Sequence, residues 1–324
     1  MAGLLTKGDF VVGVDIGGTK MMAAVVNHKF EIVGRCKKKS KSRKLDEPAE
    51  GRIERIIRAA LEEAGNPPIR GIGAGSPGPL DPATGIIIDT PNLGWKNFPL
   101  AENLQKAFGV SVVVDNDVNV GTYGEWSFGD VSDCEDIIGI FPGTGIGGGI
   151  IINRKLLHGF SGAAGEFGHI TLDVDGPLCG CGKRGCLEAL ASRIAIAKEI
   201  AAAAREDAPY ILEKCGTDLA NIRSGIIAEA IANGEKVVED IVRKAAFYTG
   251  LAVGNFINVL SAEAVVLGGG LVEAMPAIYL DEVTRGEEVH AMPFLFKNVR
   301  IVPAKLGDDA VVLGAAKMIA ERLA

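Results

Sequence analysis

The sequence has few aromatic residues, no excess of positive charge and no long apolar run. Aromatic side chains make up 6% of the 324 residues, and the formal net charge is −7. An acidic chain is a poor binder of nucleic acids and anionic membranes. No segment is long and apolar enough to cross a bilayer, and the N-terminus has no signal-peptide pattern. We therefore expect a cytoplasmic protein with no membrane or nucleic-acid partner.

One local exception to the acidic balance is the basic stretch Arg35–Lys44, which reads RCKKKSKSRK. No aromatic residue is interleaved with these cations, and the rest of the chain is acidic. We therefore interpret the stretch as a solvated strand end and loop rather than as a nucleic-acid site.

The cysteines form no disulfide framework. Three of the six lie within Cys179–Cys186, whereas Cys36, Cys134 and Cys215 are scattered. This distribution is typical of a reducing compartment and of a metal cluster. Together with His169, the clustered thiols Cys179, Cys181 and Cys186 supply a complete Cys₃His set for tetrahedral zinc. Because four protein ligands leave no open position for an activated water, we predict a structural zinc site.

The common nucleotide-binding motifs are absent. The sequence contains no G-x-x-x-x-G-K-[ST]. Two stretches match G-x-G-x-x-G, namely GAGSPG at residues 73–78 and GTGIGG at residues 143–148. A dinucleotide site requires a helix to begin at that motif, but a turn follows the first stretch and a strand follows the second. We therefore exclude both a P-loop and a Rossmann site.

Glycine is abundant, with 43 residues in short clusters, and two of these clusters mark a repeated pattern. A strand, a glycine turn with a threonine and a second strand occur at DIGGTK and again at FPGTGIGG. Strands and amphipathic helices alternate after each copy. We predict a duplicated α/β fold of two domains with a ligand cleft between them and a boundary near residues 117–124.

The two glycine turns are candidate phosphate sites. Backbone N–H groups at such turns can form an anion-binding nest. Thr19 and Thr144 add hydroxyl groups, and Lys20 adds a positive charge. The alternative is that both are ordinary hairpins, but two copies carrying threonine exceed what packing requires.

Several motifs occur together in a fixed order: DIGGTK, PGP at Pro77–Pro79, DNDVN at Asp115–Asn119, GTGIGGG, GEFGH and CGCGKRGCLE. With these motifs the chain resembles the ROK family of bacterial sugar kinases and related repressors, most of all its glucokinases. The resemblance covers nearly the whole chain. It implies two ribonuclease-H-like domains in an actin/hexokinase-like fold, in which the C-terminal helix, residues 308–323, packs on the N-terminal domain. On this basis the predicted small N-terminal domain comprises residues 1–118 plus 308–324, and the large domain with the zinc loop comprises residues 119–307. It also implies a homodimer or homotetramer.

The resemblance further implies an ATP site with Mg²⁺. Asp15 would hold the metal ion through water, to offset the charge of the transferred phosphoryl group. Two sets of residues would contact the phosphates and the nucleoside. They are Gly17, Gly18, Thr19, Lys20, Gly143, Thr144 and Gly145 for the phosphates, and Gly268, Gly269 and Gly270 for the nucleoside.

Asp117 is the candidate catalytic base. It follows the apolar strand VSVVV, and a carboxylate there can accept the proton of an attacking sugar hydroxyl. From the residues alone, DND could equally be a turn or a helix cap; the resemblance favours catalysis. It also implies sugar ligands, because amides and carboxylates discriminate hydroxyl orientation. These ligands are Asn92, Asn116, Asp117, Glu166, His169 and Glu188.

The zinc would act as a brace. It ties residues 176–186 to His169 and so positions Glu166 and Glu188, while the second ring nitrogen of His169 contacts the sugar. On this basis Cys181→Ala should impair sugar binding and spare the ATP site. His28, His158 and His290 receive no function.

The expected activity is transfer of the ATP γ-phosphate to the 6-hydroxyl of glucose. A related hexose or N-acetylhexosamine (mannose, fructose, N-acetylglucosamine or N-acetylmannosamine) is an alternative substrate, and polyphosphate is an alternative donor. A sugar-responsive repressor or sensor is a less favoured class. Family repressors carry a DNA-binding segment before this domain, whereas DIGGTK begins here at Asp15.

Overall fold

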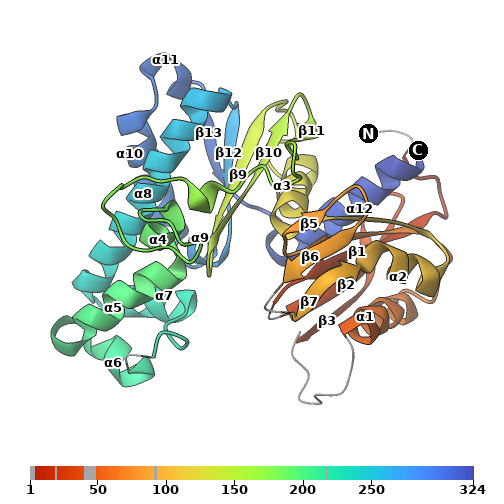
Figure 1. The fold of residues 1–324 in the computed structure, drawn as a ribbon, viewed down its shortest axis with the longest axis horizontal. Helices are drawn as coiled ribbons and strands as arrows, with labels where there is room; N and C mark the ends of the chain where they lie inside the picture. Colours follow the sequence, from red (N-terminus) through yellow and green to blue (C-terminus); the bar gives the residue numbers. More distant parts are fainter. Residues whose placement is uncertain (1–3, 19, 40–48, 91–92, 217) are drawn as a thin grey trace. The chain divides into compact units, whose positions relative to one another are not determined.

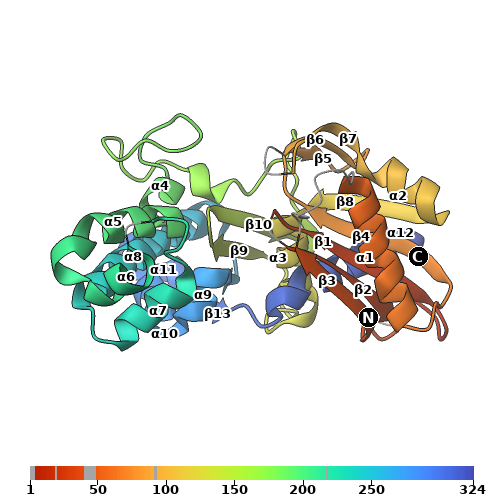
Figure 2. The same cartoon turned by 90° about the horizontal axis from the view of Figure 1, so that it is seen from below.

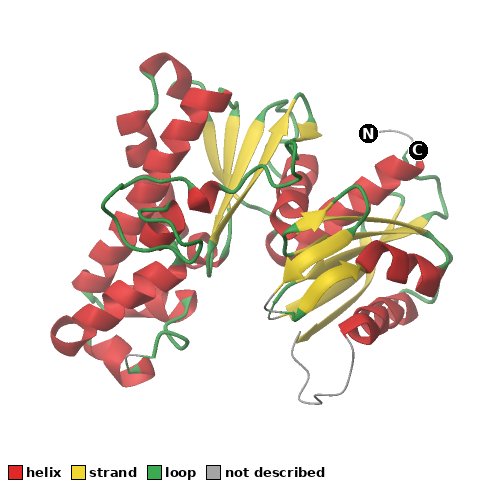
Figure 3. Ribbon diagram, viewed as in Figure 1, coloured by secondary structure: helices red, strands yellow, loops and turns green. Residues whose placement is uncertain are grey.

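The computed structural model describes residues 4–18, 20–39, 49–90, 93–216 and 218–324 (Figure 1). The chain divides into two compact units. Unit 1 comprises Met1–Ser132, Leu156–Ala164 and Asp308–Ala324. Unit 2 comprises Asp133–Lys155 and Gly165–Gly307. Each unit combines one five-stranded sheet with helices (Figure 3).

The sheet of unit 1 has the strand order β3-β2-β1-β4-β8. The first three strands of the chain are antiparallel neighbours, and β4 and β8 run parallel to β1. The strand bounds are β1 (Phe10–Ile16), β2 (Lys20–Asn27), β3 (Ile32–Lys39), β4 (Ile69–Ser76) and β8 (Ser111–Asn116). A small second sheet contains β5 (Leu80–Asp81), β6 (Ile86–Thr90) and β7 (Trp95–Pro99).

Helices cover both faces of the unit 1 sheet (Figure 2). On one face, apolar residues of α1 (Ala49–Glu63) and α2 (Leu100–Phe108) share a core with Val12, Val14 and Ile16 of β1. On the other face lie α3 (Asp117–Phe128) and α12 (Ala310–Leu323). The approach of α12 is so close that a Cβ at Gly13 would lie 1.9 Å from the Val312 carbonyl oxygen.

Unit 2 repeats this sheet in the order β11-β10-β9-β12-β13. The antiparallel pair β9–β10 corresponds to β1–β2, and β12 and β13 run parallel to β9. The strand bounds are β9 (Ile137–Pro142), β10 (Ile146–Ile152), β11 (Lys155–Leu156), β12 (Ala264–Leu267) and β13 (Arg300–Pro303). The predicted duplication and the mixed α/β class are confirmed by this shared strand order.

Unit 2 also holds most of the helices. Its core combines the long helix α8 with α10 and the shorter helices around them. The helix bounds are α4 (Leu187–Ala191), α5 (Arg193–Asp207), α6 (Pro209–Cys215), α7 (Ser224–Ala232), α8 (Lys236–Leu260), α9 (Gly270–Ala274), α10 (Pro276–His290) and α11 (Pro293–Phe296), with 3₁₀ turns at Phe167–His169 and Gly307–Asp309. No helix within the described ranges is long and apolar enough to span a membrane.

The division of the chain differs from the predicted boundary at residue 118. Helix α3 belongs to unit 1 because small residues bring it against α12: a Cβ at Gly124 would lie 2.1 Å from the Ala310 carbonyl oxygen. The short segment Leu156–Ala164 also belongs to unit 1, although the sequence placed it in the second domain. The C-terminal helix does pack on the N-terminal unit, through β1, β4 and α3.

Candidate active-site residues

The first glycine turn joins β1 to β2. The turn is closed by the Gly17 N–H, which donates to the Lys20 carbonyl oxygen at 2.9 Å. A Cβ at Gly17 would lie 2.7 Å from that oxygen, so this position requires glycine. Thr19 lies outside the described residues.

Asp15 and Asp117 form an acidic pair in unit 1. Burial raises the pKa of Asp15 to about 7, and the negative charges of Asp117 and Asp308 add to this effect. Asp15 stands level with Gly75 of β4, which in turn stands level with Asp115 of β8. Two neighbouring carboxylates that resist ionisation suit a divalent cation, which would favour their charged forms.

Asp117 begins α3 but does not cap it. The cap is Asn116, whose Oδ1 accepts from the N–H groups of Val118 at 2.9 Å and Asn119 at 3.2 Å. Asp117 Oδ1 also accepts from the Val118 N–H, at 2.9 Å. Burial raises the pKa of Asp117 to about 6. The capping alternative for DND therefore falls to Asn116, and the Asp117 carboxylate retains an oxygen for a substrate.

Sequence reasoning missed His158. Its Nε2 lies 2.5 Å from Oδ2 of Asp115, a residue with only 1% of its side chain exposed. The other oxygen of Asp115 accepts from the Asn116 N–H at 2.7 Å and from Asn119 Nδ2 at 3.2 Å. The hydrogen bond to Asp115 raises the pKa of His158. His158 and Asp115 are 43 positions apart in the sequence, so the only local signal for this contact was an aspartate at the end of an apolar strand, beside Asn116.

The second glycine turn, in unit 2, contacts Glu188 of α4. The Gly143 N–H donates to the Gly145 carbonyl oxygen at 2.8 Å, and the Ile146 N–H donates to Glu188 Oε2 at 3.1 Å. A Cβ at Gly145 would lie 2.3 Å from the same carboxylate oxygen. Thr144 Oγ1 accepts from Arg193 Nη2 at 3.2 Å. A predicted sugar ligand thus contacts the predicted phosphate turn.

The glycines after β12 lie beside this turn. The Gly268 N–H donates to the Ile140 carbonyl oxygen of β9 at 3.0 Å. Gly269 has φ +84°, and a Cβ there would lie 2.7 Å from the Pro142 carbonyl oxygen. Gly270 begins α9. The segments Gly143–Gly145 and Gly268–Gly270 therefore share one edge of the sheet.

His169, Cys179, Cys181 and Cys186 converge in unit 2. All four ligand atoms lie within 4.8 Å of one another. His169 Nδ1 is 3.7 Å from Cys179 Sγ, and the thiols of Cys181 and Cys186 are 3.6 Å apart. Zinc–sulfur bonds of about 2.3 Å in a tetrahedron put ligand atoms at about these separations. The residues thus fit one tetrahedral metal ion.

Glu166 and Glu188 flank the metal cluster. His169 Nε2, the ring nitrogen turned away from Cys179, is 4.0 Å from Glu166 Oε2. Cys179 Sγ is 4.0 Å from Glu188 Oε1. The structure therefore brings together the sugar candidates of unit 2 with the cluster, and Asp15, Asn116 and Asp117 in unit 1. Asn92 lies outside the described residues.

Comparisons with known proteins identify relatives that align with nearly the whole chain. A glucokinase of Halalkalibacterium halodurans is 33% identical over 318 residues, which cover 96% of this chain and 95% of the relative. A xylose repressor of Caldicellulosiruptor bescii is 30% identical over 95% of this chain and 77% of the repressor. The crystal structure of a ROK family glucokinase from Streptomyces griseus, in complex with glucose and AMPPNP, superposes with a TM-score of 0.79 at 32% identity over 95% of this chain and 98% of that one. The ROK family profile matches residues 11–322, and the chain therefore belongs to the ROK family.

Proposed function

We propose that this protein is an ATP-dependent hexose kinase of the glucokinase type, which phosphorylates the 6-hydroxyl of glucose. The S. griseus relative binds glucose and an ATP analogue, and this chain aligns with nearly all of it. The observation that carries the proposal is the environment of Asp117. It stands at the carboxyl end of β8 with a raised pKa and an available oxygen, near a second carboxylate, Asp15.

In the proposed reaction Asp117 accepts the proton of the sugar 6-hydroxyl. The hydroxyl oxygen forms a bond to the γ-phosphorus, the bond from that phosphorus to the β,γ-bridging oxygen breaks, and ADP leaves. Asp15 would hold Mg²⁺, which supplies positive charge to the phosphate oxygens. The N–H groups of the turns at Gly17–Lys20 and Gly143–Gly145 would bind the phosphates, with Thr19 and Thr144. Gly268–Gly270 would contact the nucleoside.

The sugar would be bound by amide, carboxylate and imidazole groups. Asn116 Oδ1 accepts the hydrogen bonds that cap α3, so its amide nitrogen is the group that would donate to a sugar hydroxyl. Glu166 and His169 Nε2 lie close enough to share one hydroxyl between them. Glu188 and Asn92 complete the proposed ligand set.

The Cys₃His cluster would hold a structural Zn²⁺. All four ligand positions are filled by the protein, so the ion would fix backbone geometry rather than activate water. Because His169 and Glu188 border the cluster, the ion would orient both proposed sugar ligands.

An ADP-release assay tests the activity. Purified protein with MgATP is offered glucose, mannose, fructose, N-acetylglucosamine and N-acetylmannosamine. In a parallel set tripolyphosphate replaces ATP and the sugar phosphate is measured instead, because this donor leaves pyrophosphate and not ADP. We expect turnover on glucose with ATP and a fall in kcat of about 10²–10⁴-fold in Asp117→Asn. Asp89→Asn, an exposed position on β6, is the matched control and should leave kcat unchanged.

Each other outcome has a distinct meaning. Turnover on another sugar would keep the kinase and replace the substrate. Sugar binding without turnover on any donor would replace the kinase by the regulator class to which the xylose repressor relatives belong. Size-exclusion chromatography with light scattering tests the expected homodimer or homotetramer.

A further inference from the structure

Arg193, the first residue of α5, is bound to the second glycine turn. Its backbone N–H donates to the Gly143 carbonyl oxygen at 2.9 Å, and its Nη2 donates to Thr144 Oγ1 at 3.2 Å. Its Nη1 donates to the Ile222 carbonyl oxygen, at 3.1 Å, shortly before α7 begins. One guanidinium group therefore joins the candidate phosphate turn to the segment that leads into α7.

The contact with Arg193 fixes the direction of the Thr144 hydroxyl. A guanidinium group carries only hydrogen-bond donors, so Thr144 Oγ1 must be the acceptor in this contact. The hydroxyl proton then points away from Arg193, and it has no acceptor among the described residues. Because Thr144 is exposed, this proton is available to a ligand. Phosphate oxygens are acceptors of the required kind.

Arg193 and Arg223 are two neighbouring cations without a carboxylate partner. Arg223 precedes Ser224 of α7, and a Cβ at Gly270 would lie 3.6 Å from Ser224 Oγ. Partial burial lowers the pKa of Arg193, and the positive charge of Arg223 adds to this effect. Within the described ranges neither arginine forms an ion pair. Like charges held close together in this way favour a bound anion.

Glu188 places a negative charge beside the same turn. Its Oε2 accepts from the Ile146 N–H at 3.1 Å. This carboxylate would repel a phosphate group, and the N–H groups of the turn carry only partial positive charges. Two full positive charges near the turn would offset this repulsion.

We propose that Arg193 and Arg223 bind the phosphate groups of the donor nucleotide, and that Arg193 also positions the Thr144 hydroxyl. This role presupposes the function proposed above, because it needs a nucleotide at the turn Gly143–Gly145. Arginine suits the role, since its planar group can hold two phosphate oxygens at once. Arg193 has five N–H groups of this kind, and its contacts with Thr144 and Ile222 leave donors for a ligand.

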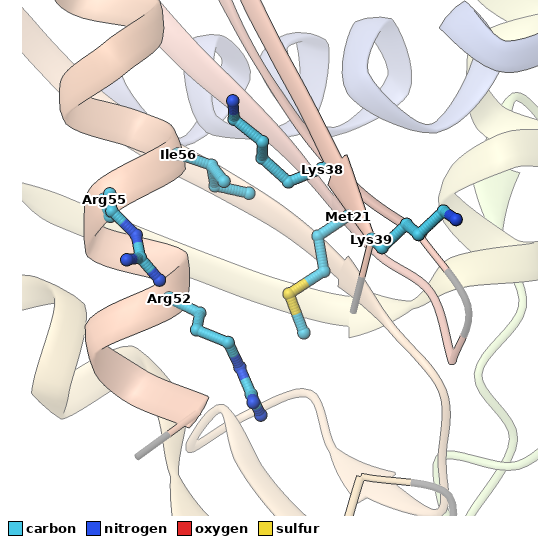
Figure 4. Close-up of a pocket in the computed structure, with 6 residues that line it drawn as sticks. All are labelled: Met21, Lys38, Lys39, Arg52, Arg55 and Ile56. Carbon is cyan, nitrogen blue, oxygen red and sulfur yellow. The ribbon is translucent and has the colours of Figure 1, made fainter. Parts of the chain in front are cut away.

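A second cluster of cations lines a pocket of about 350 Å³ in unit 1 (Figure 4). The pocket is lined by Met21, Lys38, Lys39, Arg52, Arg55 and Ile56. These cations are not a common set of free charges. Arg55 already has an interaction partner, and Lys39, level with Lys20 in the β2–β3 pairing, belongs by strand alternation to the opposite face of the sheet from Lys38. The pocket therefore provides a control for nonspecific attraction of phosphate.

Calorimetric titration of the full chain with MgADP tests the proposal. Arg193→Gln should weaken binding about tenfold or more, because a charge-assisted contact is lost and Thr144 is no longer oriented. Arg223→Gln should weaken binding about threefold, since an exposed charge is screened. Lys198→Gln, at an exposed position on the same helix as Arg193, and Arg52→Gln in the unit 1 pocket should each change the affinity less than twofold.

Steady-state kinetics separate positioning from a folding defect. KM for ATP should rise in Arg193→Gln, while KM for glucose stays within twofold of the wild type. Arg193→Lys keeps the charge but cannot make both contacts, so it should recover part of the affinity. Thr144→Val removes the hydroxyl. In that background Arg193→Gln should cause a smaller loss than in the wild type, because the two residues share one contact.

The possible failures are distinguishable. Wild-type protein that binds no MgADP would overturn the proposed function together with this role. If Arg193→Gln binds MgADP as tightly as a wild type that phosphorylates sugar, the kinase stands and this role alone is refuted. Equal rises in KM for ATP and for glucose would also refute it, because they indicate a general disturbance of unit 2. Weakened binding in Arg52→Gln alone would assign the phosphates to the unit 1 pocket.

Discussion

Replacing His158 by glutamine should destabilise unit 1 in a pH-dependent way. His158 is the partner of Asp115 Oδ2, and Asp115 is almost fully buried. A hydrogen bond to a charged group contributes about 1.5–3 kcal/mol to stability. Because the imidazole is 36% exposed, solvent screening places the loss near the lower end, at about 1.5 kcal/mol.

The sign of the pH dependence follows from the direction of the shift. The contact with Asp115 raises the pKa of His158 in the folded state. Its extra stability is therefore complete below the unfolded pKa of about 6.5 and is lost as pH rises through the higher folded value. The difference in unfolding free energy between wild type and His158→Gln should be largest near pH 6 and smaller at pH 9.

The assay is urea unfolding followed by tryptophan fluorescence. The only two tryptophans, Trp95 and Trp126, both lie buried in unit 1 and report that unit alone. His28→Gln, at a histidine with no hydrogen-bond partner among the described residues, is the matched control. Equal stability of wild type and His158→Gln at pH 6, or a gap that grows with pH, would refute the reasoning.

Three further predictions rest on single contacts. Gly13→Ala should destabilise unit 1 by about 3 kcal/mol in the same urea assay, since its Cβ would meet the Val312 carbonyl, whereas Gly121→Ala on α3, whose Cβ would make only an ordinary contact of 3.5 Å with Val311 Cγ2, should be neutral or stabilising. Cys181→Ser should lower bound zinc, measured by elemental analysis, and should raise KM for sugar. Contrary to the expectation from the sequence that the ATP site is spared, it should also raise KM for ATP, because Glu188 accepts from the Ile146 N–H; an unchanged ATP KM in a zinc-depleted variant would contradict this coupling. The kcat of the wild type should fall as pH drops below about 6, the pKa to which burial raises Asp117, and a flat profile down to pH 4.5 would exclude Asp117 as the base.

Local sequence patterns sufficed to predict the duplicated α/β fold and the turns on which the glycine motifs lie. The repeat of strand, glycine turn and strand identified the duplication, since a glycine such as Gly17 has a backbone reason to be there. Taken by itself, the sequence of residues 187–204 favours one helix. The structure has two, α4 and α5, because Ser192 Oγ accepts from the Ala195 N–H and caps the start of α5. A single serine inside an apolar run gave no reason to expect that break.

Contacts between distant residues were beyond the sequence. The hydrogen bond between His158 and Asp115 joins a loop to the end of β8. Glu188 of α4 contacts the turn at Gly145, which lies far from it in the sequence. The basic stretch Arg35–Lys44 was interpreted as a solvated strand end and loop. The ion pairs of Arg35 with Asp309 and of Lys37 with Asp308 became visible only with α12 placed against the sheet.

The carboxylates near the candidate site of unit 1 differ in whether a basic side chain pairs with them. Asp308 pairs with Lys37, which lowers the pKa of Asp308, and Asp115 pairs with His158. Among the described residues, neither Asp15 nor Asp117 forms an ion pair, and both have raised pKa values. Among the described residues, the protein thus pairs Asp308 and Asp115 with basic side chains and leaves Asp15 and Asp117 short of positive charge. A metal ion at Asp15 and a hydroxyl proton at Asp117 would supply the missing positive charge. This is the electrostatic basis for assigning the phosphoryl-transfer chemistry to these two residues.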